Sequence, residues 1–63
     1  MRMIEVTEFY NGDRVLVSVE NIIKVEEDSE SNSCDIYLDM SEEPIECQET
    51  YDEVLSKIKE TND

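Results

Sequence analysis

A chain of 63 residues has room for one hydrophobic core, so the sequence predicts a single small domain over residues 1–63. Its 18 Asp and Glu residues against 5 Lys and Arg give a net charge of −13. That charge argues against direct binding to nucleic acid or an anionic membrane, whose phosphates need cationic side chains, and the expected partner is a basic protein surface.

The first predicted hairpin joins strands at about 3–10 and 14–26, each of which alternates apolar and polar residues. Asn11-Gly12 lies between them and predicts a tight turn, because both turn positions need positive φ. A local break in the second strand is expected at Asn21. The side chains of this strand that are expected to point inward are Val15, Val17 and Val19, then Ile23 and Val25.

The second predicted hairpin follows an acidic loop at 27–33 and joins strands at about 34–40 and 44–49. Its inward side chains are expected to be Cys34, Ile36, Leu38, Met40, Ile45 and Cys47. The acidic loop can be aligned with an EF-hand calcium loop, with oxygen ligands at Asp28, Glu30, Asn32 and Asp39. Ser33 replaces the glycine of that loop and no helices flank it, so we expect solvated carboxylates and no metal.

The last predicted element is a helix at about 51–60. Thr50 and Glu53 form a capping box at its start. An apolar stripe is expected to face the sheet and consists of Tyr51, Val54, Leu55 and Ile58. The predicted fold is therefore α+β: a small antiparallel four-stranded sheet of two hairpins, meander-like, with one C-terminal helix packed on its apolar face.

The sequence offers little for catalysis. It contains no His and a single Gly, so the commonest general base and a glycine-rich phosphate loop are both missing. Cys34 and Cys47 are flanked by carboxylates, which raise the pKa of a thiol and weaken it as a nucleophile. We expect no enzymatic activity, no cofactor and no metal site.

The two cysteines also bear on location. They are expected to face each other across the second hairpin, where a disulfide is geometrically conceivable. With no signal peptide and no apolar run long enough to span a membrane, reduced thiols and a cytoplasmic location are expected, in a host cell if the chain is phage-encoded.

The candidate binding face is the outer side of the second hairpin. Residues two apart on a strand lie ~6.6 Å apart on the same face, so Asp35 and Asp39 bracket Tyr37, with Glu46 on the next strand. The array extends to Glu5, Glu20 and Glu49 if their strands keep the expected alternation. Regular carboxylates of this kind are expected to imitate a phosphate backbone, whose charges recur every ~3.4 Å along each strand.

Two other interpretations of the surface stay open. The acidic face is equally expected to serve solubility alone, as charged surfaces commonly do. An exposed contact patch is the other possibility, and its members would be Phe9, Leu16 and Tyr37.

The order of elements resembles the FlbD/SwrD family of small flagellar and swarming-motility proteins. The stretches that carry the resemblance are VTEFYNGDRVLVSVENIIKVEE and ETYDEVLSKIKE, which together cover most of the elements. Where that family has basic residues after the second hairpin, Glu42 and Glu43 stand here. The resemblance implies a regulatory adaptor that contacts its partner through the helix and the hairpin edge.

Three functions follow as expectations. The first is a non-enzymatic inhibitor that mimics nucleic acid and binds a basic protein, of the kind that phages use against host nucleic-acid-handling or defence proteins. The second is the motility adaptor that the resemblance implies. The third is a homo-oligomer that captures a small ligand between subunits, which unpaired strand edges and a thin core would permit.

Overall fold

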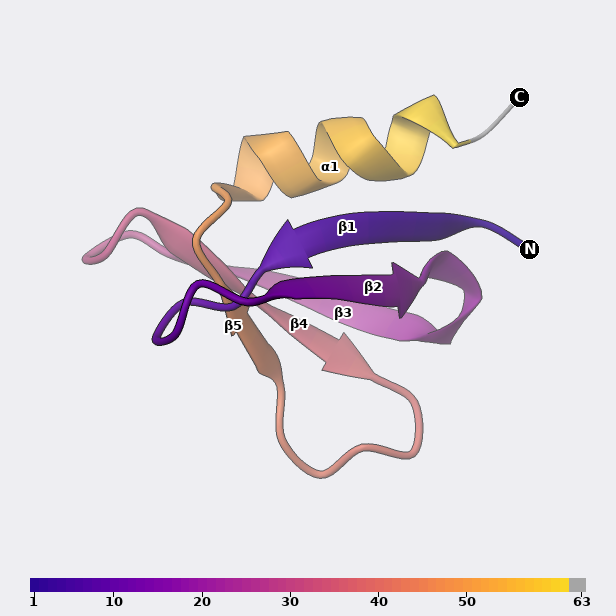
Figure 1. Ribbon diagram of the computed structural model, residues 1–63, viewed down its shortest axis with the longest axis horizontal. Coiled ribbons are helices and arrows are strands. Elements are labelled where there is room, and N and C mark those ends of the chain that lie inside the picture. The colour runs from indigo at the N-terminus through magenta and orange to yellow at the C-terminus, as the bar shows by residue number, and fades with distance from the viewer. Residues whose placement is uncertain (62–63) are drawn as a thin grey trace.

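The computed structural model describes residues 1–61 as five strands, one 3₁₀ turn and one helix (Figure 1). In chain order these are β1 (Met3–Thr7), β2 (Arg14–Ser18), the 3₁₀ turn (Val19–Asn21), β3 (Ile22–Asp28), β4 (Ser33–Leu38), β5 (Ile45–Cys47) and α1 (Tyr51–Glu60). β1 and β2 form one antiparallel sheet, and β3, β4 and β5 form another. The α+β class is confirmed, whereas the expected single four-stranded sheet is wrong.

The fifth strand arises because the 3₁₀ turn divides the predicted strand 14–26. Val19 is buried at the start of this turn, and its N–H donates to the carbonyl of Arg2 at 3.0 Å. At the end of the turn, the carbonyl of Asn21 accepts from the N–H of Asp39 at 2.7 Å. The turn thus touches both sheets, and the chain passes from one to the other at the point where only a local break was expected.

The first hairpin is confirmed, but its turn is wider than Asn11-Gly12 alone predicts. The connection covers residues 8–13, with the N–H of Glu8 donating to the carbonyl of Asp13 at 2.8 Å. Gly12 has a φ of +76°, whereas the φ of Asn11 is not positive, so the two residues do not form the predicted tight turn. The Asn11 side chain instead accepts from the N–H of Asp13 at 2.9 Å, which stabilises the wider loop.

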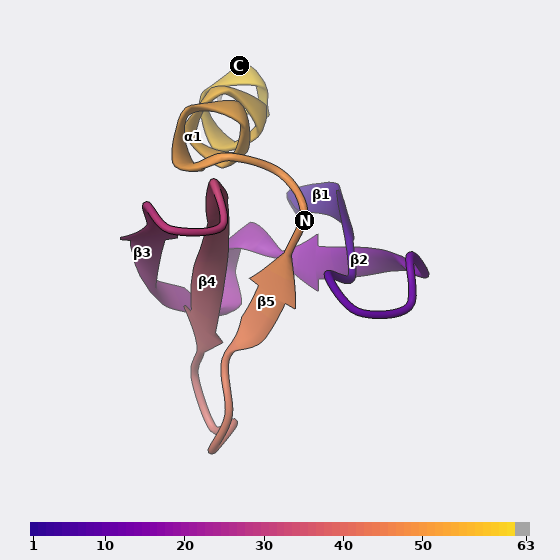
Figure 2. The same ribbon diagram turned by 90° about the vertical axis from the view of Figure 1, so that its left-hand side faces the viewer.

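The two sheets are joined where the end of β1 meets β5. The N–H of Phe9 donates to the carbonyl of Glu46 at 2.9 Å, and the N–H of Gln48 donates to the carbonyl of Thr7 at 2.8 Å. The strands therefore follow one another in space as β2, β1, β5, β4 and β3. Figure 2 shows the two sheets meeting at an angle, with α1 lying across their open side.

The core lies between the inner faces of both sheets and α1. Its fully buried members, which leave 2% or less of their surface exposed, are Val6, Val17, Cys34, Ile36, Cys47 and Val54. Ile4 and Val19 complete the buried set. All are small or medium-sized, so the apolar area withdrawn from water is modest for a domain of this length.

The helix begins and ends where the sequence predicts. The hydroxyl of Thr50 accepts from the N–H of Glu53 at 3.2 Å, and the carboxylate of Glu53 accepts from the N–H of Thr50 at 2.9 Å. Only Val54 of the apolar stripe is fully buried, whereas Tyr51 and Leu55 each leave 36% of their surface exposed. The helix therefore covers the core with one edge of its stripe and leaves the other edge in solvent.

The loops around the second hairpin differ from the prediction. β3 continues to Asp28, so the acidic connection is a tight turn over residues 29–32 in which Asn32 has a φ of 54°. β4 ends at Leu38, and Met40 has a φ of 66° and is almost fully exposed. The expectation that Met40 lines the core is wrong, because the left-handed backbone at this position turns the chain out of the sheet.

Candidate functional site

The strand register places three carboxylates in one line across the second sheet. Glu26 on β3 pairs with Asp35 on β4, and Asp35 pairs with Glu46 on β5. We call these three residues the acidic row. Neighbouring strands lie ~4.8 Å apart, and directly opposed residues share a face, so the row crosses the outer face of the sheet at about that spacing. Asp35 and Glu46 are half-buried, and Glu26 is exposed.

Tyr37 lies next to the acidic row on β4 and is held by two neighbours on β3. Its hydroxyl donates to Glu26 at 3.3 Å, and the ammonium of Lys24 lies 4.4 Å from the centre of its ring. Asp39 follows one residue after the end of β4 and is exposed. The outer face thus presents an aromatic ring between one cation and several carboxylates.

The electrostatic environment of the acidic row is strongly negative. Partial burial raises the pKa of Asp35, and the nearby charges of Asp28 and Glu26 raise it further. Tyr10 reaches the same face from the first loop, and a hydrogen bond with Glu46, together with the charge of that carboxylate, raises the pKa of the Tyr10 hydroxyl. Carboxylates that repel one another in this way gain from any cation placed among them.

The structure places two of the expected site residues in other roles. Glu20 accepts from the guanidinium of Arg2 at 2.7 Å, and this hydrogen bond lowers the pKa of the Glu20 carboxyl. Glu49 accepts from the N–H of Thr7 at 2.8 Å and from its hydroxyl at 2.9 Å. The two contacts of Glu49 tie the segment after β5 to β1 on the side of the molecule where the sheets join.

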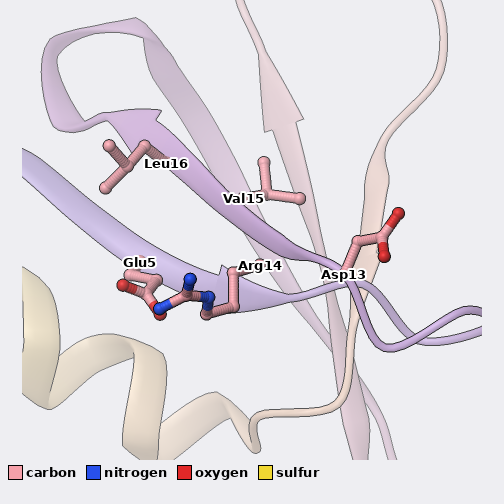
Figure 3. A pocket seen from close by; sticks show the side chains of 5 residues that line it. All are labelled: Glu5, Asp13, Arg14, Val15 and Leu16. Carbon is pink, nitrogen blue, oxygen red and sulfur yellow. The ribbon is translucent and has the colours of Figure 1, made fainter.

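Glu5 lies on the outer face of the other sheet. It pairs with Leu16 on β2, and Arg14 lies on the same face two pairs further along, opposite Thr7. Figure 3 shows Glu5 and Arg14 on neighbouring strands around one shallow hollow, which is also lined by Asp13, Val15 and Leu16. The structure therefore brings Asp35, Tyr37 and Glu46 together, with Asp39 beyond the strand end, and leaves Glu5 in a surface of mixed charge.

Sequence reasoning missed Glu26 and Lys24 as members of the outer face. Both belong to the predicted strand 14–26, for which the sequence predicts pairing with the strand 3–10 but no register against the strand 34–40. The register between β3 and β4 shifts between Ile22 and Lys24, and this shift decides which β3 residues lie beside Asp35 and Tyr37. A bulge of this kind leaves no clear pattern in the sequence.

The thiols of Cys34 and Cys47 face each other in the core as expected, with 3.2 Å between their sulfur atoms. Both are free and buried, and burial raises the pKa of each thiol. Among residues 1–61, no group of three or more His, Cys, Asp or Glu side chains is placed to hold a metal ion. None of the helices in that range is long and apolar enough to cross a membrane.

Comparisons with family models, curated proteins and solved structures find no match to this chain. The resemblance to the FlbD/SwrD family therefore stays a prediction. The most distinctive feature of the described surface is the acidic row beside Tyr37.

Proposed function

We propose that this chain is a non-enzymatic binding protein that engages a basic surface of another protein through the outer face of β3, β4 and β5. The observation that carries the proposal is the alignment of Glu26, Asp35 and Glu46 by strand pairing. The sheet fixes the backbone positions from which these carboxylates extend, so a cationic partner spends none of its binding energy on ordering the backbone.

The contacts expected at this face follow from its chemistry. Lys or Arg side chains of the partner insert between the carboxylates of the acidic row and relieve their mutual repulsion. An Arg side chain of the partner also stacks on Tyr37, because a planar guanidinium suits an aromatic face. The net charge of −13 steers a basic partner toward the molecule from a distance and speeds association at low salt.

The finer form of the proposal is mimicry of nucleic acid. The acidic row repeats at ~4.8 Å between strands, against ~3.4 Å of axis for the phosphates along one strand of a duplex. A protein that holds phosphates with Lys and Arg meets a similar density of negative charge here. The partner would then be a nucleic-acid-handling protein that is inhibited by occupation of its binding site.

The experiment is affinity capture from cell lysate at ~50 mM and ~500 mM NaCl, with quantitative mass spectrometry, because salt screens charge-driven contacts. The test variant carries Glu26→Gln, Asp35→Asn and Glu46→Gln. The matched control replaces the exposed residues Glu42, Glu43 and Glu60 by Gln, which removes the same charge away from the acidic row. A partner captured by the control and lost by the test variant supports the proposed face.

The outcomes separate the candidate functions. Capture that is strong at low salt, lost with the test variant and displaced by short double-stranded DNA supports mimicry of nucleic acid. Capture that both variants lose equally reflects net charge alone and contradicts a specific face. A motility component retained at both salts by the test variant would favour the adaptor function instead.

A further inference from the structure

A second surface lies between β3 and α1 and is apolar. A groove of about 280 Å³ runs there, lined from the strand by Ile22, Ile23, Lys24 and Val25 and from the helix by Tyr51, Leu55 and Ile58. Ile23 leaves 69% of its surface exposed, although it is a large aliphatic residue in a strand. Exposed apolar residues that gather along one groove are typical of an interaction site.

The position of Ile23 has a structural cause. Ile22 pairs with Leu38 and Lys24 pairs with Tyr37, so Ile23 is the extra residue of a bulge in β3. A bulge redirects the side chain that it inserts. Here it adds Ile23 to the groove instead of to the core, while Val25 keeps the regular alternation.

The backbone of β3 is also available beside this groove. β3 is the outer strand of its sheet, and within residues 1–61 it is paired only with β4. Half of the N–H and C=O groups of such an outer strand point away from the sheet and form a ready template for one more strand. A sheet edge that runs beside an apolar groove is a recurring site for an added peptide strand.

Charge decides which strand this edge accepts. The end of β3 carries Glu26, Glu27 and Asp28 against the single cation of Lys24, and the first turn of α1 carries Asp52 and Glu53. Carboxylates on an edge strand discourage pairing with a second copy, and two molecules of net charge −13 repel each other. A cationic strand meets no such barrier.

We infer that the groove binds an extended segment of a partner protein in which apolar residues alternate with Lys or Arg. The segment adds to the free edge of β3 by backbone hydrogen bonds. Its apolar side chains pack against Ile23, Leu55 and Ile58, and its cations lie beside the carboxylates at the end of β3. This surface shares Glu26 with the acidic row but is otherwise separate from it, and the inference stands whether or not the row binds a partner.

The test is selection of random octapeptides displayed on phage against the whole chain. The test variant is Ile23→Ser with Leu55→Ser, and the matched control is Leu16→Ser with Met40→Ser, which alters two exposed apolar residues elsewhere. Circular dichroism confirms that each variant is folded. Selected peptides are then synthesised for affinity measurement and for amide hydrogen exchange of the complex by NMR.

We expect selected peptides with alternating apolar and basic residues that slow hydrogen exchange along β3. Loss of two apolar contacts is expected to weaken their binding at least about tenfold in the test variant, against less than about twofold in the control. Ile23→Ser alone should show a weakening in the same direction.

Three results would overturn the inference. One is selection that does no better on the wild-type chain than on the test variant. Another is a set of selected peptides with apolar residues at helical spacing and no effect on the amides of β3. The third is a dimer in sedimentation that Ile23→Ser dissolves, because a second copy would then be the occupant.

Discussion

The charge of Asp35 opposes folding but favours the binding of a cation. The same burial and neighbouring charges that raise the pKa of its carboxyl make the ionised form unfavourable in the folded state and attractive to a cation. The row therefore costs the isolated protein some stability at neutral pH. Binding sites often carry such local strain, and here it comes first from the partial burial of Asp35 and then from the charges of Asp28 and Glu26.

The expected consequence is that Asp35→Asn stabilises the free protein at pH 7 by a few tenths of a kcal/mol, the scale of a like-charge pair across strands. Because the folded pKa is raised, the stability that protonated Asp35 contributes is present below the unfolded value of ~3.9 and lost as pH rises through the folded value. The gain from the substitution should thus disappear near pH 3. Urea denaturation of the wild type and the variant at pH 7 and pH 3 measures this difference in the free energy of unfolding.

Glu20→Gln is the control of opposite sign. The guanidinium of Arg2 lowers the pKa of Glu20, so the stability from this pair is present above the unfolded pKa and lost as pH falls through the folded one. Glu20→Gln should lower the free energy of unfolding at pH 7 and have little effect on it in acid. If both substitutions change stability in the same direction at pH 7, the assigned environments of the two carboxyls are wrong.

The thiols of Cys34 and Cys47 should be almost unreactive in the folded chain. Burial raises the pKa of both, which lowers the fraction of each cysteine present as reactive thiolate, and the core shields the sulfur atoms. Labelling by iodoacetamide at pH 8 should proceed readily in urea and slowly without it. Rapid labelling of the native protein would show that the second hairpin opens frequently.

At the scale of the elements, the sequence predicts what depends on neighbours along the chain. Thr50 and Glu53 fix the start of α1 because both partners of the capping box lie within one helical turn. The pairing of Cys34 with Cys47 follows from a short hairpin. The break at Asn21 is predicted by the sequence, but the passage of the chain into a second sheet at the 3₁₀ turn is not, because it depends on contacts distant in sequence.

The candidate site divides in the same way. Asp35, Tyr37 and Glu46 belong to one hairpin, and alternation is enough to place them on one face. Glu26 joins them only through the bulge at Ile23, which alternation does not reveal. Glu49 had the right polarity for the surface, but its carboxylate satisfies the backbone of Thr7 on another strand.

The contact with Thr7 makes Glu49 a link between β1 and the segment after β5. Removing the Glu49 carboxylate should therefore destabilise the fold where the two sheets meet. Glu49→Ala leaves the half-buried N–H of Thr7 without its acceptor, and the loss of a hydrogen bond to a charged group costs about 1–3 kcal/mol. Chemical denaturation measures the change. Glu42→Ala, at an exposed loop position, should stay within about 0.5 kcal/mol of the wild type. Equal effects would remove the structural role assigned to Glu49.

At the scale of the whole molecule, the net charge of −13 opposes compaction of a small core. Salt should therefore stabilise the protein, because the Debye length falls from ~30 Å at 0.01 M to ~10 Å at 0.1 M and repulsion between distant carboxylates is screened. A stabilisation on the order of 1 kcal/mol from this screening corresponds to a rise in Tm of ~4–8 °C for a domain of this size. Thermal unfolding by circular dichroism across this range of NaCl measures it.

The Glu42, Glu43 and Glu60 to Gln variant is the control for this effect. It removes three of the negative charges at exposed positions, so its Tm at low salt should be higher and its rise with salt smaller. Arg2 and Glu20 form an ion pair that salt weakens, which opposes the trend only locally. A Tm that falls with added NaCl would mean that specific ion pairs outweigh the general repulsion, and the acidic surface would then be part of what holds the fold together.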